Sequence, residues 1–286
     1  MPRSPIDLNQ MVRNVLQHVS PLIPDADCPI KHFEGSANTG FSLIKYIREH
    51  VDPLSIYEGV FVRHLGHLQR MVLAELIESF ERFLKELAAV CVDRLAPFST
   101  DDRFDEFSLK RAEQISAFVT SNSIGKALCE SDTWINNESI NKRFKSLLKF
   151  PFGSDWEFLF PAPNQPPDAE RSRAATLAIL WQIRHNLAHN LGVITHSDSM
   201  RFRMLVNGAV PADCRLSPQL QDLSYVKRFL SETAAHTNQR VGQRLAEVLS
   251  RLHAADPTLF DAQMMADEVS QRFAYSVTIN GVAGTI

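Results

Sequence analysis

Residues 57–95 read YEGVFVRHLGHLQRMVLAELIESFERFLKELAAVCVDRL, and this stretch decides the fold class. Apolar side chains recur every three or four residues along it, which predicts one amphipathic helix from about residue 52 to residue 95. The other face carries charged pairs four residues apart, such as Glu78 with Arg82. Gly66 offers a point for a break. A helix of this length predicts a helical bundle as the body of the protein.

The rest of the chain is also helical in pattern. Glycine is scarce, with 11 residues in 286, and a chain with few forced turns suits long helices. Ser121 and Asn122 offer an N-cap for one of the shorter helices. Further helices are expected over residues 5–19, 41–51, 108–120, 122–130, 138–149, 168–194, 219–254 and 258–273.

Two segments alternate in the manner of strands. Residues 200–206 alternate apolar residues with arginine and then reach Asn207-Gly208. Residues 275–279 alternate apolar residues with Ser and Thr and then reach Asn280-Gly281. An Asn-Gly pair between alternating residues is a strong hairpin signal, so we predict a small β-hairpin element on a mainly α protein.

Composition places the chain among ordinary globular proteins, with 44% hydrophobic and 22% charged residues. Thirty basic residues against thirty-three acidic ones give a formal net charge of −3. This balance excludes a uniformly basic coat for nucleic acid, so any such contact must come from a local patch.

Cysteine usage and hydropathy point to the cytoplasm. The four cysteines, at 28, 91, 129 and 214, form no close pair, which leaves neither a metal knuckle nor a disulfide framework. Asp7 and Arg13 lie where a signal peptide needs an apolar run. The most apolar stretch, 174–183, ends at Arg184 and is too short to span a bilayer, so no membrane contact is expected.

A basic face is expected on the helix over 138–149. No acid occurs between Glu138 and Asp155, and the predicted buried stripe of Ile140, Phe144, Leu147 and Leu148 leaves the lysines on the opposite side. Such a face suits RNA phosphates, and a solvated basic surface is the alternative. The candidate RNA-binding residues are Lys142, Arg143, Lys145 and Lys149.

The segment that follows, Phe150 to Pro167, holds five prolines and five aromatic residues. Long connections without regular structure tend to be functional or disordered. Trp156 is a candidate for stacking on a base of single-stranded RNA. The alternative is that the aromatic side chains pin this loop to the bundle.

The helix over 168–194 carries the strongest candidate for chemistry. Its apolar ends enclose Arg184, His185, Asn186, His189 and Asn190. Burying a guanidinium, two imidazoles and two amides is costly unless each finds a partner. A polar cluster in so apolar a helix predicts a functional site.

The run Arg184-His185-Asn186-Leu187-Ala188-His189 resembles the R-x4-H motif of nuclease-type members of the HEPN (higher eukaryotes and prokaryotes nucleotide-binding) superfamily. A second match, from Arg13 to His18, lies on a mixed-surface helix without apolar flanks and is read as coincidence. The resemblance implies a HEPN-like helical bundle over residues 1–196. Residues 197–286 would then form a C-terminal helical extension with short strands.

The resemblance also implies an activity, which is metal-independent RNA cleavage without any cofactor. Arg184 would hold the phosphate, His189 would act as general acid or base, and His185 or Asn186 would orient it. Arg184 lies about 140° from His189 on an ideal helix, so a homodimer with converging motifs is expected. Toxins and antiphage abortive-infection effectors are common members of this superfamily, and such a protein needs a restraining antitoxin or sensor.

Two other interpretations of the motif remain open. His185 and His189 lie one helical turn apart, as in helical zinc sites, with His64, His67 or His196 as a third ligand. The metalloprotease signature, however, needs Glu where this chain has Asn186. The second alternative is a non-catalytic HEPN-like dimerisation or binding module, in which the cluster is a satisfied polar network.

Overall fold

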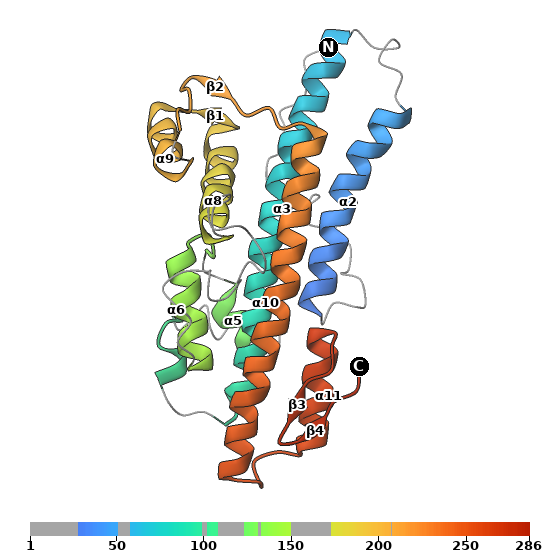
Figure 1. Ribbon diagram of the computed structural model, residues 1–286, viewed down its shortest axis with the longest axis vertical. Coiled ribbons are helices and arrows are strands. Elements are labelled where there is room, and N and C mark those ends of the chain that lie inside the picture. Colours follow the sequence, from blue (N-terminus) through green and yellow to red (C-terminus); the bar gives the residue numbers. More distant parts are fainter. Residues whose placement is uncertain are drawn as a thin grey trace, which may run out of the picture.

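A computed structural model describes residues 28–50, 58–98, 102–107, 123–130, 133–149, 173–206 and 208–286. Within these ranges the chain is mainly helical with small antiparallel β elements, as predicted (Figure 1). The helices expected over 5–19 and 108–120 lie outside the described residues. The helices are α2 (Pro29–His50), α3 (Glu58–Leu95), α5 (Ile124–Cys129), α6 (Asn137–Leu148), α8 (Arg173–Asn190), α9 (His196–Val206), α10 (Leu220–Ala255) and α11 (Ala262–Phe273), with a 3-10 turn, η2, at Asp102–Phe104. The strands are β1 (Val193–Ile194), β2 (Cys214–Arg215), β3 (Thr278–Ile279) and β4 (Val282–Ala283).

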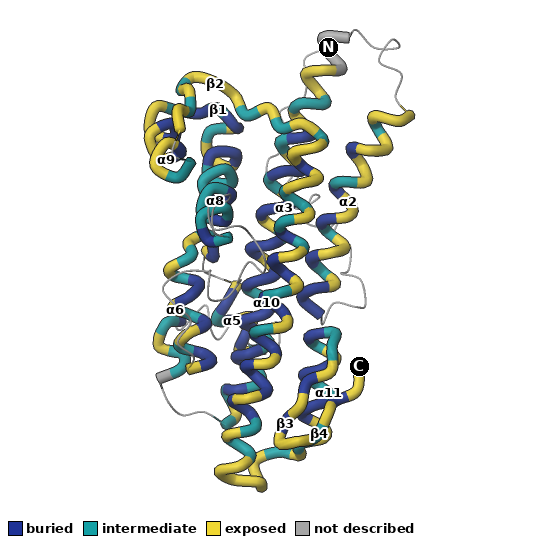
Figure 2. The backbone as a smooth tube through the Cα atoms, in the orientation of Figure 1, coloured by how far each residue is buried: buried dark blue, intermediate teal, exposed yellow. Residues whose placement is uncertain are grey.

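Helix α3 is the axis of the bundle and continues through Gly66 without a break. The long helices α2 and α10 run beside it (Figure 1). The predicted apolar stripe of α3 is confirmed, since Leu76, Phe80, Leu84 and Leu87 are almost fully buried. Figure 2 shows the buried sides of the three helices turned toward one another. None of the described helices combines the length and apolarity that a membrane span requires.

On another side of α3 lie α5, α6 and α8. Helix α5 approaches closely because Gly125 has no side chain: a Cβ there would lie 2.1 Å from the backbone oxygen of Ala89. The N-cap of α5 is Ser123, one residue after the expected Asn122, and its hydroxyl accepts from Lys126 N–H. The predicted helix is correct in place, and the cap prediction is wrong by one residue.

The strand predicted over 200–206 is wrong, because this segment is part of helix α9. Thr195 and Asp198 form a capping box: the Thr195 hydroxyl accepts from the Asp198 N–H at 3.2 Å, and the Asp198 carboxylate accepts from the Thr195 N–H at 3.1 Å. The buried residues Asp198, Ser199 and Phe202 then follow the helical period. The capping box and the burial at helical spacing favour a helix here, in spite of the alternation of apolar and polar residues over 200–206.

The C-terminal hairpin is confirmed. β3 and β4 pair antiparallel, and Asn280 and Gly281 both have positive φ, at 48° and 81°, as a type I′ turn requires. A second antiparallel pair, β1 with β2, was not predicted and ties the end of α8 to the segment before α10.

One hydrophobic cluster spans the expected domain boundary at residue 196. Leu230, Val241 and Leu245 of α10 belong to the same cluster as the buried stripe of α3. The chain after residue 196 therefore helps to form the core of the bundle.

Candidate functional site

Helix α8 carries the motif and is fixed to the bundle through Trp181. The indole ring stacks on Phe80 of α3 with 5.9 Å between centroids. Its Nε1–H donates to Asn137 Oδ1 at 2.8 Å, and the Asn137 amide donates to the Ala174 carbonyl at 2.8 Å. These bonds satisfy the buried indole and fix the orientation of α8 about its axis.

Arg184 faces α3 and lies between two carboxylates. Its Nε is 3.6 Å from Glu78 Oε1 and its Nη2 is 3.8 Å from Glu81 Oε2. Glu81 is almost buried, and it also accepts from the Trp134 N–H at 2.9 Å and pairs with Lys85 at 3.1 Å. The ion-pair partners of Arg184 therefore belong to its own chain, and both pairs are long and weak.

His185 and His189 lie against each other one turn apart. Their ring centroids are 4.5 Å apart and the ring planes make an angle of 50°. His185 is half-buried and His189 is exposed. Neither imidazole forms a hydrogen bond with any residue in the described part of the chain. Since Arg184 faces α3, the structure joins the two histidines with each other and not with the arginine.

Asn186 is fully buried and joins α8 to α9. Its amide nitrogen donates to the Val193 carbonyl at 2.7 Å and to Asp198 Oδ2 at 2.9 Å. The same carboxylate oxygen accepts from Asn190 Nδ2 at 2.9 Å and from the hydroxyl of Thr195 at 2.8 Å. Asn186 therefore acts as a structural connector within a polar network, and its amide points at Asp198.

The charge of Asp198 depends on this network. Burial by itself raises the pKa of the carboxyl group. The hydrogen bonds from Thr195, Asn186 and Asn190 outweigh that effect, so the pKa lies below its ordinary value. Gln182 Nε2 adds a further bond at 3.1 Å to the second oxygen. Asp198 is a buried anion stabilised by donors from α8 and from its own helix cap.

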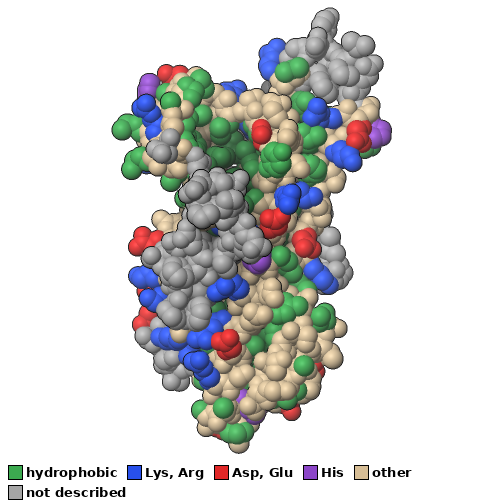
Figure 3. All heavy atoms as spheres, viewed as in Figure 1, with side chains coloured by type: hydrophobic (Ala, Val, Ile, Leu, Met, Phe, Trp, Pro, Cys, Tyr) green, Lys and Arg blue, Asp and Glu red, His purple; other side chains and the backbone are tan. Residues whose placement is uncertain are grey.

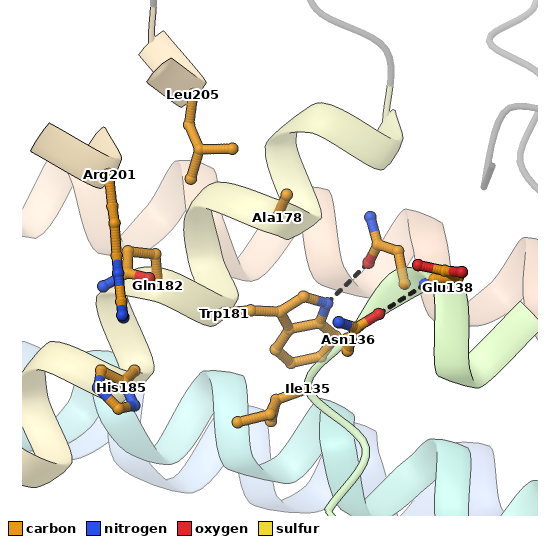
Figure 4. Close-up of a pocket in the computed structure, with 10 residues that line it drawn as sticks. Ile135, Asn136, Glu138, Ala178, Trp181, Gln182, His185, Arg201 and Leu205 are labelled. Carbon is orange, nitrogen blue, oxygen red and sulfur yellow. Dashed lines mark hydrogen bonds between the residues drawn. The ribbon is translucent and has the colours of Figure 1, made fainter. Parts of the chain in front are cut away.

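A pocket of about 440 Å³ opens beside His185 (Figure 4). It lies between α8, the start of α6 and α9. Two of its lining residues, Arg201 and Leu205, come from the segment 200–206 that was wrongly predicted as a strand and is part of α9. Its lining residues are Ile135, Asn136, Asn137, Glu138, Ala178, Trp181, Gln182, His185, Arg201 and Leu205.

The predicted stripe and basic face of α6 are present. Ile140, Phe144, Leu147 and Leu148 are fully buried, and the lysines are exposed. The basic residues differ in their partners: Lys142 pairs with Glu106 at 3.0 Å, and Arg143 lies 4.8 Å from the centroid of the Trp134 ring. Lys145 has no ion-pair partner among the described residues. Figure 3 shows Lys and Arg side chains gathered over α6 and the neighbouring part of α10.

Lys149 ends α6 in a left-handed conformation with φ of 47°. It lines a small pocket of about 140 Å³ together with three arginines, Arg103, Arg244 and Arg251. The basic face of α6 therefore continues onto α10. Trp156 lies outside the described residues, as does the second motif match at Arg13 to His18.

A metal centre finds no support in the described ranges, where no group of three or more His, Cys, Asp or Glu side chains could hold an ion. His64, His67 and His196 thus provide no third ligand for the pair of His185 and His189. No protein-family model matches the chain, and comparisons with curated proteins and with solved structures return no similar protein.

Proposed function

We propose that the chain is a metal-independent endoribonuclease of the HEPN type. The observation that carries the proposal is the pair of His185 and His189, whose ring centroids are 4.5 Å apart, together with the pocket of about 440 Å³ that His185 lines. Histidine is the side chain whose ordinary pKa lies nearest neutral pH, and two adjacent imidazoles supply both an acid and a base.

The proposed reaction needs only a proton acceptor and a proton donor. The ribose 2′-oxygen attacks the adjacent phosphorus, and its proton passes to one neutral imidazole. The P–O5′ bond breaks as the other imidazole, in its protonated form, gives a proton to the 5′-oxygen. The products are a 2′,3′-cyclic phosphate and a 5′-hydroxyl. The exposed His189 is the residue that RNA reaches most easily.

The proposed active form is a homodimer. Arg184 faces away from the histidine pair within one chain, so in the arrangement that the resemblance implies, the motif of a second copy would converge on the pair. Leu191, Met200 and Met204 lie close to the motif in sequence and are exposed by 73%, 68% and 85%. Exposed apolar side chains of this size are typical of contact surfaces.

RNA would bind along the basic residues of α6 and then enter the site. Lys142 and Lys145 are exposed and able to contact phosphates, as is Lys149 at the end of the helix. Arg143 completes this surface, and Trp156, which lies outside the described residues, is proposed from the sequence alone to stack on a base. A cytoplasmic toxin or abortive-infection effector, restrained by an antitoxin or a sensor protein, is the role proposed for such a nuclease.

The test is incubation of the purified chain with total RNA in EDTA, beside His189→Ala and His185→Ala. We expect cleavage that survives EDTA, leaves cyclic phosphates and is lost in His189→Ala. His236→Ala, a histidine on α10, serves as the matched control and should cleave like the wild type. Equal cleavage by the wild type and His189→Ala would contradict the assigned site.

A second candidate function is a non-catalytic binding module. Two contacts within the chain favour it. Arg184 lies against Glu78 and Glu81, and Asn186 donates a hydrogen bond to Asp198. Polar side chains that find partners within their own chain stabilise a fold without any substrate. In that case Arg184→Ala changes the melting temperature and assembly of the protein, and no nuclease activity is detected before or after the substitution.

A further inference from the structure

The pocket beside His185 has two chemically different ends. Figure 4 shows Arg201 and His185 at one end, and Asn136 and Glu138 at the other. A cation at one end and a carboxylate at the other fix the direction in which a ligand with one phosphate binds. The volume of about 440 Å³ lies within the range of small-molecule sites.

Between the two ends, part of the wall is apolar. It is formed by the half-buried side chains of Ile135, Ala178 and Leu205. Asn136 uses its side-chain oxygen to cap α6, and Gln182 uses its amide nitrogen to bind Asp198. This leaves the amide nitrogen of Asn136 as a donor and the oxygen of Gln182 as an acceptor. An apolar wall with one donor and one acceptor suits a nucleobase.

Arg201 differs from Arg184 in having no carboxylate beside it among the described residues. It is exposed on α9 and, among the described residues, has no hydrogen-bond or ion-pair partner. In Figure 4 its side chain extends from α9 past Gln182 toward His185. Arg184, in contrast, is held by Glu78 and Glu81 on α3. A planar guanidinium without a carboxylate partner is well suited to bind a phosphate.

We propose that Arg201 holds the substrate phosphate beside His185, and that the pocket behind it selects the base of the nucleotide at the cleaved bond. This inference rests on the proposed nuclease function and names its substrate contact. The substrate class is a single-stranded RNA nucleotide, since a base in a duplex cannot enter a pocket. Arg201 is supplied by the same chain as His185.

The first experiment compares cleavage by Arg201→Ala with that by Arg203→Ala. Both arginines are exposed on α9, and only Arg201 lines the pocket. With short single-stranded RNAs that differ in one base, we expect Arg201→Ala to lower kcat/KM about 100-fold, the scale seen when one donor to a reacting phosphate or oxyanion is removed. Arg203→Ala should stay within about threefold of the wild type. Ala178→Leu, which narrows the pocket, should change the base preference.

The second experiment measures binding without cleavage. The probes are 2′-deoxynucleoside 3′-monophosphates of the four bases, which lack the attacking hydroxyl. The readout is the NMR signal of the Trp181 indole N–H, which donates to Asn137 at the pocket wall. We expect a saturable shift with one base preferred, lost in Arg201→Ala and retained in Arg203→Ala.

The two experiments separate the two proposals. RNA cleavage by Arg201→Ala at the wild-type rate and with unchanged base preference would overturn the role of Arg201 and leave the nuclease in place. Absence of cleavage by the wild type, together with base-selective binding that needs Arg201, would overturn the nuclease and support the pocket as a nucleotide site.

Discussion

Asn186 provides the sharpest test of what the motif helix does, because its partners allow the effect of a substitution to be worked out. Asn186→Ala removes a hydrogen bond to the Asp198 carboxylate and one to the Val193 carbonyl. A bond to a charged group contributes about 2 kcal/mol and a neutral one about 1 kcal/mol. The free energy of unfolding should therefore fall by about 3 kcal/mol, or roughly 6–12 °C in melting temperature.

The assay is thermal unfolding followed by circular dichroism, with RNA cleavage measured on the same samples. Asn190→Ala is the matched control, because it removes a single bond of 2.9 Å to the same carboxylate and should cost about 2 kcal/mol. An unchanged melting temperature in Asn186→Ala together with lost cleavage would refute the connector role. Asn186 would then belong to the catalytic machinery that its place in the motif predicts.

Three further outcomes are expected. Gly125→Ala should destabilise the protein by about 3 kcal/mol in urea unfolding, since the new Cβ would lie 2.1 Å from the backbone oxygen of Ala89. Gly35→Ala is the control: a Cβ there has no neighbouring atom within 4 Å, so the substitution should stabilise the helix by about 0.5–1 kcal/mol. Asn141→Leu should raise the free energy of unfolding by about 1 kcal/mol in the same assay, because this buried amide has no hydrogen-bond partner among the described residues. A loss of stability would show that the amide does form hydrogen bonds in the folded protein. Asp198 has a pKa below its ordinary value of 3.8, so its contribution to stability is complete above that value and is lost as the pH falls through the lower pKa of the folded state. The stability difference between wild type and Asp198→Asn should thus be constant from pH 7 to about pH 5 and shrink toward pH 2; a constant difference throughout would contradict this assignment.

Periodicity was enough to predict α3, α6 and α10, because each buries a stripe at helical spacing. The terminal hairpin was predictable because Asn280-Gly281 adopts the positive φ angles that its residues favour. Helix α9 was not predicted, since Met200 and Met204 mimic the apolar positions of a strand while remaining exposed. The capping box at Thr195 and Asp198 was the local signal that would have corrected the prediction.

The candidate site was predictable only in part. The contact between His185 and His189 follows from their spacing on one helix. The partners of Arg184 and Asn186 come from α3 and α9, and no pattern within the motif indicates them. Arg201 was missed for the same reason: pocket residues come from segments that meet only after the chain has folded.

The way α9 is attached has a consequence for local opening. Its main packing partners are α8 and β1, whereas the long helices are packed against one another. Such a peripheral segment opens at a lower free energy than the core around α3. Its backbone amides will therefore exchange with solvent without global unfolding, and Arg201 can move away from the pocket while the bundle stays folded. The proposed release of a nucleotide from this pocket would then depend on the contacts that hold α9 to α8, among them the hydrogen bonds from Asn186 and Asn190 to Asp198, more than on the stability of the whole protein.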